Sequence, residues 1–358
     1  MRSLIAILVA AASIAGGAGV AAAAETRTVA AVVNGLVDDV IIPAYREFEA
    51  AAGAQAEEVA ILCETPSSET LASARAAFGP LVVAYAAIEP YRFGPAQREN
   101  RYERLFFWPD RRGRGLRQIQ RVIGAEDETA TTVERLVQKS VAVQGLPALE
   151  FNLFGGGSDE LASGSAFRCS FALAVATAIE MVGAEMAAEW SGDFRQTIAS
   201  AGPDNPVYRT PEEALQDILS AAATQLELAG VHKVGAVVGE TPADARPKRA
   251  PFWRAGLPLD MVVANVAAVR GVLEGGVADL LEDDALVNSA LFELSQVDRA
   301  LKPFAEGGED LAVLLDDEAS HRRLAYAAIP LGAGQSIIGE RIQSALGLIT
   351  GFNALDGD

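Results

Sequence analysis

Apolar residues recur at helical spacing along most of the chain, in runs separated by short segments rich in Gly and Pro. In residues 27–53, for example, Val32, Leu36 and Val40 recur every fourth position, which predicts a helix that ends near Gly53. The same spacing predicts further helices over about 65–87, 116–123, 131–155, 167–189, 210–228, 257–274, 284–301, 308–328 and 336–350. Ala, Leu, Glu, Gln and Arg dominate these runs, so the predicted fold class is all-α.

One predicted helix contains a proline that is expected to interrupt it and a carboxylate among apolar residues. Its sequence, Val143 to Gly155, is VQGLPALEFNLFG. Pro147 lacks an N–H and is expected to kink the helix. Leu146, Leu149 and Leu153 share one face of the wheel, and Glu150 falls beside them. Because a buried carboxylate is costly unless it is paired or binds something, Glu150 is expected either to pair with a core Arg or to belong to a ligand site.

This stretch resembles the signature of the imelysin family. The family pattern is Gly-x-His-x-x-Glu, and here Gly145 and Glu150 match it while Pro147 stands in the place of the His. Two further stretches are similar to the family, Phe-Phe-Trp-Pro-Asp at 106–110 and Pro-Phe-Trp-Arg-Ala-Gly-Leu at 251–257. The resemblance implies a periplasmic or cell-envelope protein linked to bacterial iron uptake, of a kind often labelled a peptidase.

Two features predict how the chain is divided. Gly145-Leu146-Pro147 recurs as Gly256-Leu257-Pro258, and each copy is followed by an acid, Glu150 or Asp260. This recurrence agrees with what the resemblance implies, two helical-bundle halves in a pseudo-symmetric arrangement with the signature at their interface. Gly and Pro are frequent in residues 201–209, which predicts a boundary between domains 25–202 and 203–358.

The N-terminal segment has the pattern of a signal peptide over residues 1–24. Arg2 supplies the positive charge, an apolar run follows, and Ala22, Ala23 and Ala24 offer a cleavage site. The uncharged run is also long enough for a membrane anchor, and this alternative stays open. Cleavage predicts a periplasmic protein with no membrane span, since no later segment is expected to be long and apolar enough to cross a bilayer.

Charge and cysteine content limit the partners and the compartment. The formal net charge of -19 argues against nucleic acid or an anionic membrane surface as a partner. In an oxidising compartment the two cysteines, Cys63 and Cys169, are expected to form one disulfide that ties two helices together, with two buried thiols as the alternative. The Arg-rich residues 88–114 are expected to cross the fold and to meet buried carboxylates such as Glu150 and Asp110.

The histidines offer little catalytic chemistry. There are two, and no His-Glu-x-x-His motif is present, which argues against a zincin-type peptidase. Glu318 and His321 fit a Glu-x-x-His spacing but are expected to form a solvated helix face, and His232-Lys233 is expected to be a surface connection. No Gly-x-Ser-x-Gly elbow supports a serine nucleophile.

The remaining candidates form one predicted inter-domain pocket. Glu150, Asp110 and Asp260 offer oxygen ligands for iron or another divalent cation, with Glu150 as the first metal-ligand candidate. Arg254 can instead pair with Glu150, which would make an ion pair or an anion-binding pocket. The predicted pocket residues are Gly145, Pro147, Glu150, Asp110, Arg254 and Asp260.

Three functions follow from the resemblance and this residue set. The first is a non-catalytic binding or scaffold protein associated with iron uptake, which holds a metal ion or small ligand. The second is a metallopeptidase of the imelysin type. The third is a family member that has lost its ligand and contacts a cell-envelope protein partner.

Overall fold

The computed structural model describes residues 27–110 and 112–348, and the predicted signal peptide and C-terminal end lie outside them. The all-α prediction is confirmed: the described residues form helices and turns and contain no strand. The first half contains α1 (Val29–Leu36), α2 (Ile42–Glu64), α3 (Ser68–Ile88), α4 (Arg101–Leu105), α5 (Arg114–Gly124), α6 (Val133–Leu136), α7 (Gly145–Phe154), α8 (Ala166–Ser191) and α9 (Asp193–Ala199). The second contains α10 (Pro211–Glu227), α11 (Ala236–Val238), α12 (Pro258–Glu274), α13 (Ala285–Gly307), α14 (Leu311–Asp316), α15 (Glu318–Tyr326), α16 (Ala328–Ser336) and α17 (Gln343–Ala345).

Short helices of other types join or extend these elements. Three π-helical segments continue neighbouring α-helices, at Val37–Ile41, Leu228–Gly235 and Ile337–Ile342. The 3₁₀ turns lie at Gly94–Asn100, Glu128–Ala130, Val141–Val143, Ser158–Ser163, Pro242–Asp244, Pro247–Arg249 and Val277–Leu280. π-helical turns widen a helix and are frequent at functional sites, and the segment at Leu228–Gly235 is the one that borders the candidate site.

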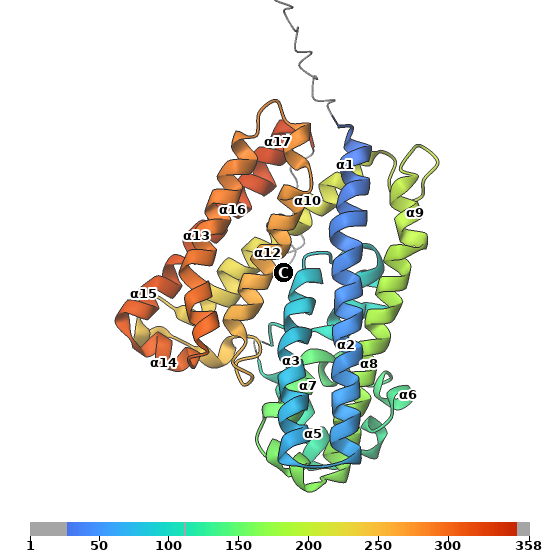
Figure 1. Cartoon of the computed structure of the whole chain (residues 1–358), viewed down its shortest axis with the longest axis vertical. Coiled ribbons are helices and arrows are strands. Elements are labelled where there is room, and N and C mark those ends of the chain that lie inside the picture. Colours follow the sequence, from blue (N-terminus) through green and yellow to red (C-terminus); the bar gives the residue numbers. More distant parts are fainter. Residues whose placement is uncertain (1–26, 111, 349–358) are drawn as a thin grey trace, which may run out of the picture.

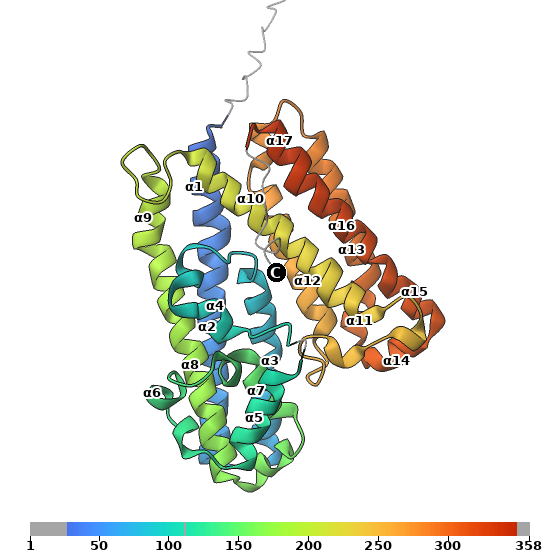
Figure 2. The same ribbon diagram turned by 180° about the vertical axis from the view of Figure 1, so that it is seen from behind.

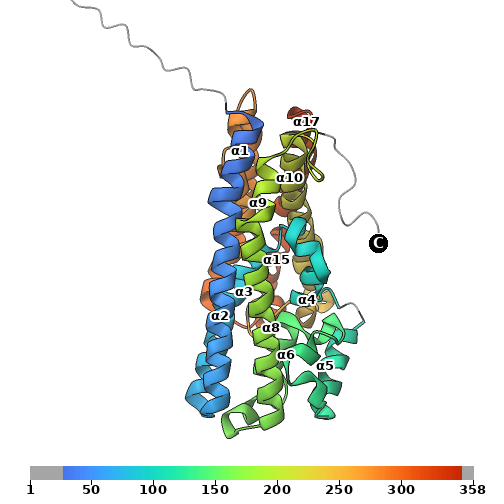
Figure 3. The ribbon, with the colours of Figure 1, turned by 90° about the vertical axis from the view of Figure 1, so that its right-hand side faces the viewer.

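The helices form two bundles that lean apart from the end where α1 meets α10 (Figures 1 and 2). In the first bundle α2 packs against α3 and α8, and Figure 3 shows α2 and α8 side by side along their length. In the second bundle α13 packs against α12 and α16, and α10 packs against α12 and α16. The bundles meet through α3 against α12 and α1 against α10, so one apolar core runs through both.

Several predicted helix ends were wrong because tertiary packing decides them. The helix predicted to end at Gly53 runs on to Glu64, since Ala52 and Ala56 are buried in the bundle and hold the helix through the glycine. The next helix begins after Ser67, which forms a capping box with Thr70, and not after Thr65. The single helix predicted over 308–328 is two helices, because Asp317 caps a new start.

Two helices have the length and composition of a membrane span, contrary to the sequence expectation. They are Ser68–Ile88 and Ala166–Ala199, and 50% and 61% of their most apolar windows are buried inside the bundle. Ion-pairing residues also lie along them, since Arg101 pairs with Glu185 and Glu189 of α8. A buried, partly charged helix of this kind is what the core of a helical bundle requires.

The predicted disulfide is confirmed and closes the far end of the first bundle. Cys63 lies at the end of α2 and Cys169 in the first turn of α8. Their Cα atoms are 5.5 Å apart across a sequence separation of 106 residues. The bond therefore fixes the pairing of α2 with α8.

Replacing both cysteines, as Cys63→Ser/Cys169→Ala, is expected to lower the free energy of unfolding by about 2–5 kcal/mol, because the unfolded chain regains the freedom of a long loop. Urea unfolding followed by circular dichroism measures the loss. Dithiothreitol should weaken the wild type by a similar amount and leave the variant unchanged. Equal stability of the wild type in oxidising and reducing buffer would contradict this role.

Candidate functional site

The signature stretch forms α7, and a glycine is required where it starts. Gly145 has φ +69°, and a Cβ atom there would lie 2.2 Å from the carbonyl oxygen of Arg104 and 2.3 Å from that of Leu105. No other residue fits this close approach to α4. Pro147 falls in the first turn, where its missing N–H costs no helical hydrogen bond, so the predicted kink is absent and α7 begins here.

Glu150 is buried on α7 and paired with Arg254, the alternative that the sequence left open. Its side chain is nearly enclosed, with a residue exposure of 4%. Oε1 accepts a hydrogen bond of 2.9 Å from the Arg254 backbone N–H, and Oε2 one of 3.3 Å from its guanidinium. Burial raises the pKa of the Glu150 carboxyl, and the charge of Arg254 opposes this shift.

Arg254 is held in place by the aromatic segment before α12. The guanidinium lies 4.4 Å from the ring centroid of Trp253 and 5.2 Å from that of Phe151. Phe252 has φ +55°, an uncommon conformation for a residue with a side chain. Its buried ring packs 5.6 Å from Phe78 and 5.3 Å from Phe106, so contacts from the first bundle fix this turn.

A cavity of about 800 Å³ opens in front of this pair, within the size range of small-molecule sites. Three parts of the chain form its wall: residues 106–119, the start of α7, and residues 231–254. Four of the predicted pocket residues line it together, Asp110, Pro147, Glu150 and Arg254. The structure therefore brings the signature and both aromatic segments to one cavity, lined from both halves of the chain.

The other two predicted pocket residues do not line the cavity. Gly145 acts through its backbone at the α4 contact. Asp260 lies half-buried in the first turn of α12, where burial raises the pKa of its carboxyl. Gly256 has φ +73° and precedes Pro258 at the start of α12, so the two Gly-Leu-Pro copies share a left-handed glycine followed by a helix start.

A family model described as imelysin (Peptidase_M75) matches residues 41–333. The chain belongs to the imelysin family. A comparison with curated proteins finds no significant match.

Two solved structures are similar to the fold at low sequence identity. An imelysin-like protein from Psychrobacter arcticum 273-4 has a TM-score of 0.74 and 19% identity, with 91% of this chain and 98% of that chain covered. A protein from Parabacteroides distasonis ATCC 8503, described as an iron-regulated protein A precursor, has a TM-score of 0.66 and 18% identity, with 89% and 95% covered. At these identities the likeness concerns the fold.

The residues of the cavity do not fit a resident metal ion, which the resemblance to imelysins had suggested. Pro147 offers no donor atom, and both oxygens of Glu150 bind Arg254. Asp110 accepts hydrogen bonds from the N–H groups of Arg114 (2.7 Å) and Leu116 (3.2 Å) and so caps α5. Across residues 27–110 and 112–348, no three His, Cys, Asp or Glu side chains are grouped as metal ligands.

The prediction that Glu318 and His321 share a solvated helix face was wrong for His321. Glu318 is exposed and pairs with Arg322, but His321 is buried and its Nε2 donates to the Val238 carbonyl oxygen at 3.1 Å. His232 lines the cavity from the π-helical segment. No periodic signal marks His232 in the sequence, because the π-helical turn changes which side chains face outward.

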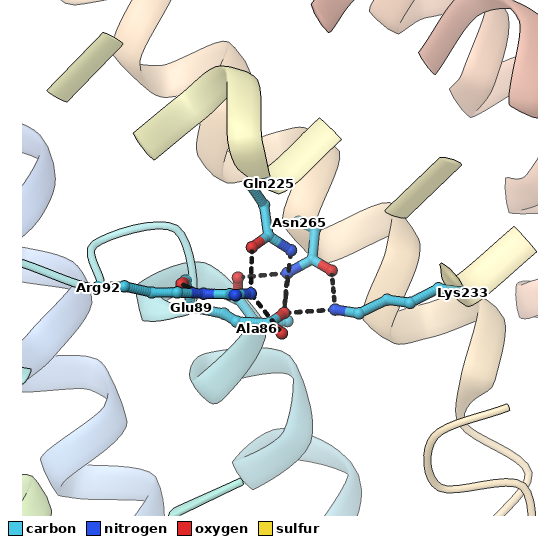
Figure 4. Close-up of polar contacts among 6 residues, drawn as sticks. All are labelled: Ala86, Glu89, Arg92, Gln225, Lys233 and Asn265. Atoms are coloured by element: carbon cyan, nitrogen blue, oxygen red, sulfur yellow. Dashed lines mark hydrogen bonds and ion pairs between the residues drawn. The ribbon is translucent and has the colours of Figure 1, made fainter. Parts of the chain in front are cut away.

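Lys233, predicted at the surface, is the centre of a buried polar cluster (Figure 4). Its ammonium donates to Glu89 Oε2 and, at 2.7 Å, to Asn265 Oδ1. The amide nitrogens of Gln225 and Asn265 also donate to Glu89 Oε2, at 3.0 and 2.9 Å. Arg92 adds a guanidinium contact of 3.3 Å to Glu89 Oε1. The residues come from α3, the segment after it, α10, the π-helical segment and α12.

The cluster lies directly behind the cavity wall. The Lys233 ammonium is 6.0 Å from the ring centroid of Trp108, and Trp108 lines the cavity. Both charged side chains of the central pair have 0% exposure. Burial lowers the pKa of the Lys233 ammonium to about 8, and the Glu89 carboxylate opposes this shift. The Arg side chains of the Arg-rich segment thus pair with Glu89, Glu185 and Glu189, and none of those that the structure describes forms an ion pair with the expected Glu150 or Asp110.

Lys233→Met is expected to lower the free energy of unfolding by about 3–5 kcal/mol, because it leaves the Glu89 carboxylate buried without its cation. The double variant Glu89→Gln/Lys233→Met should regain part of that loss. Urea unfolding of the two variants and the wild type measures both effects. Lys248→Met makes the same change at an exposed lysine, and an equal loss in this control would contradict the account.

Glu150→Gln is expected to change how stability depends on pH. The folded pKa of Glu150 lies above its ordinary value of 4.5, so the folded state holds the proton more tightly than the unfolded state. Its contribution to stability is therefore greatest below that value and falls as pH rises through the folded pKa. Urea unfolding between acid and neutral pH should give a steeper fall for the wild type than for the variant, and parallel curves would contradict the shift.

Proposed function

We propose that this protein is an exported, non-catalytic ligand-binding member of the imelysin family that serves iron uptake in the cell envelope. Its ligand site is the cavity beside Glu150. The observation that carries the proposal is the convergence of the signature helix and both aromatic segments on one cavity of about 800 Å³. Asp110, Pro147, Glu150 and Arg254 are the proposed ligand-site residues; Gly145 starts the helix that carries Pro147 and Glu150, and Asp260 lies in the first turn of α12.

The bonding of the cavity carboxylates favours binding over hydrolysis. A general base needs a carboxylate oxygen that points toward a bound water molecule within hydrogen-bond reach. Glu150 directs both oxygens to Arg254, and Asp110 directs both to the first turn of α5. These hydrogen bonds therefore stabilise the wall of the cavity.

The link to iron and to export is supported by the relatives and by the N-terminus. The Parabacteroides neighbour is described as an iron-regulated protein A and as a precursor. Residues 1–24 here have the pattern of a signal peptide, which supports a periplasmic location for the mature chain. The disulfide supports an oxidising compartment.

Calorimetric titration of the mature chain with ferric citrate, citrate and ferrous sulfate tests this function. We expect saturable binding of ferric citrate that Val231→Trp abolishes, because Val231 lines the cavity and is 54% exposed, so a larger side chain fills the space without disturbing the core. Val207→Trp is the matched control, since Val207 is 53% exposed and lies outside the cavity. Equal binding by both variants, or no binding of any iron species, would refute the proposed role.

A casein hydrolysis assay separates this proposal from the peptidase that the family name suggests. We expect no cleavage above the level of the Val231→Trp variant. Cleavage that Glu150→Gln abolishes would establish the enzyme instead. If neither ligand binding nor cleavage occurs, capture of a cell-envelope partner becomes the function to test.

A further inference from the structure

Two cations at the rim of the cavity have no acidic partner among the described residues. Lys248 and Arg249 lie in the 3₁₀ turn Pro247–Arg249, and both line the cavity and are exposed. Neither side chain makes an ion pair within residues 27–110 and 112–348. In a chain with 48 acidic and 29 basic residues, two adjacent unpaired cations beside a cavity are an uncommon arrangement.

The acidic groups of the cavity do not offset these two charges. Glu150 is neutralised by Arg254, with an oxygen–nitrogen distance of 3.3 Å. Asp110 is compensated by two backbone N–H groups and by the positive end of α5. After these pairings, the charge left free toward the cavity mouth belongs to Lys248 and Arg249.

Aromatic rings form much of the remaining wall and favour a flat ligand. Phe107, Trp108 and Trp253 line the cavity and are each only half-buried. Indole and phenyl rings bind flat rings by offset or edge-on stacking. The Lys248 ammonium lies 5.5 Å from the Trp253 ring centroid, so one rim cation stands directly beside an aromatic surface.

We infer that the cavity binds a flat organic anion, with its ring against the cavity aromatics and its carboxylate or phosphate at Lys248 and Arg249. This inference rests on the proposed function, because it names the chemical class of ligand for the same site. A bare metal cation would meet two unpaired positive charges at the mouth, and the two cavity carboxylates already accept hydrogen bonds from other groups of the protein. A cationic ring would meet the same repulsion, and a neutral ring would leave both rim charges without a partner.

Three probes with one ring system and different charge test the inference. Calorimetric titration of the mature chain with 2-naphthoate, 2-naphthalenemethanol and 2-naphthylmethylammonium changes the charged group and keeps the ring. We expect 2-naphthoate to bind about tenfold or more tighter than the alcohol, as charge-assisted hydrogen bonds allow. The ammonium probe should bind weakest.

Charge reversal at the rim tests which residues recognise the anion. Lys248→Glu/Arg249→Glu should weaken 2-naphthoate binding by about tenfold or more and leave the alcohol within a factor of about two. The matched control is Arg135→Glu/Arg209→Glu, which changes the net charge equally at two exposed arginines outside the cavity. This control should retain the affinity of the wild type for both probes.

Several outcomes overturn the inference. These are equal affinities for 2-naphthoate and the alcohol, tighter binding of the ammonium probe, equal losses in the rim variant and its control, or no binding of 2-naphthoate. If ferric citrate still binds in a manner that Val231→Trp abolishes, only the ligand class is wrong. If 2-naphthoate binds through the rim and no iron species binds, the ligand class stands and the role in iron uptake fails.

Discussion

The buried pair of Glu89 and Lys233 is the constraint on which the arrangement of the two bundles depends. Two opposite charges without access to water are tolerated only when they pair closely and further hydrogen bonds compensate them. Here Asn265, Gln225 and Arg92 supply such bonds, from α12, α10 and the segment after α3 (Figure 4). Any sliding of one bundle over the other would break several of these bonds at once. The interface therefore has one favourable register.

The shape of the cavity depends on the register of the interface between the two bundles. Its wall is drawn from residues 106–119 and α7 of the first half and from residues 231–254 of the second. His232 and Lys233 are neighbours in the π-helical segment, one facing the cavity and the other the buried cluster. Trp108 lies between the cluster and the cavity. The fixed interface, together with the contacts of Phe252 with Phe78 and Phe106, thus places the Arg254 turn opposite Glu150.

The sequence predicted most helices and a poorly solvated Glu150 from local patterns, and the disulfide from the cysteine count of an exported chain. It failed where the outcome depends on distant contacts. Lys and His are residue types that usually lie at the surface. Lys233 and His321 are buried here because Glu89 and the Val238 carbonyl oxygen accept hydrogen bonds from them. The sequence predicts a helix end at Gly53 because it does not show that α8 packs beside this glycine. The role of the rim cations Lys248 and Arg249 could not be predicted, because it depends on a cavity that the sequence does not show.

At Pro147, the residues that set the position of α7 differ from those that determine the chemistry of the cavity surface. The glycine at 145 and the Glu150–Arg254 pair set the position of α7, and neither needs a particular side chain at 147. A proline suits the first helical turn, so it replaces the family's histidine without moving the helix. What changes is the cavity surface, which has an apolar ring where a nitrogen donor would stand. With the carboxylates already bonded, the wall then has rings and rim cations left to recognise a ligand, and such a surface selects for shape and negative charge rather than for a metal.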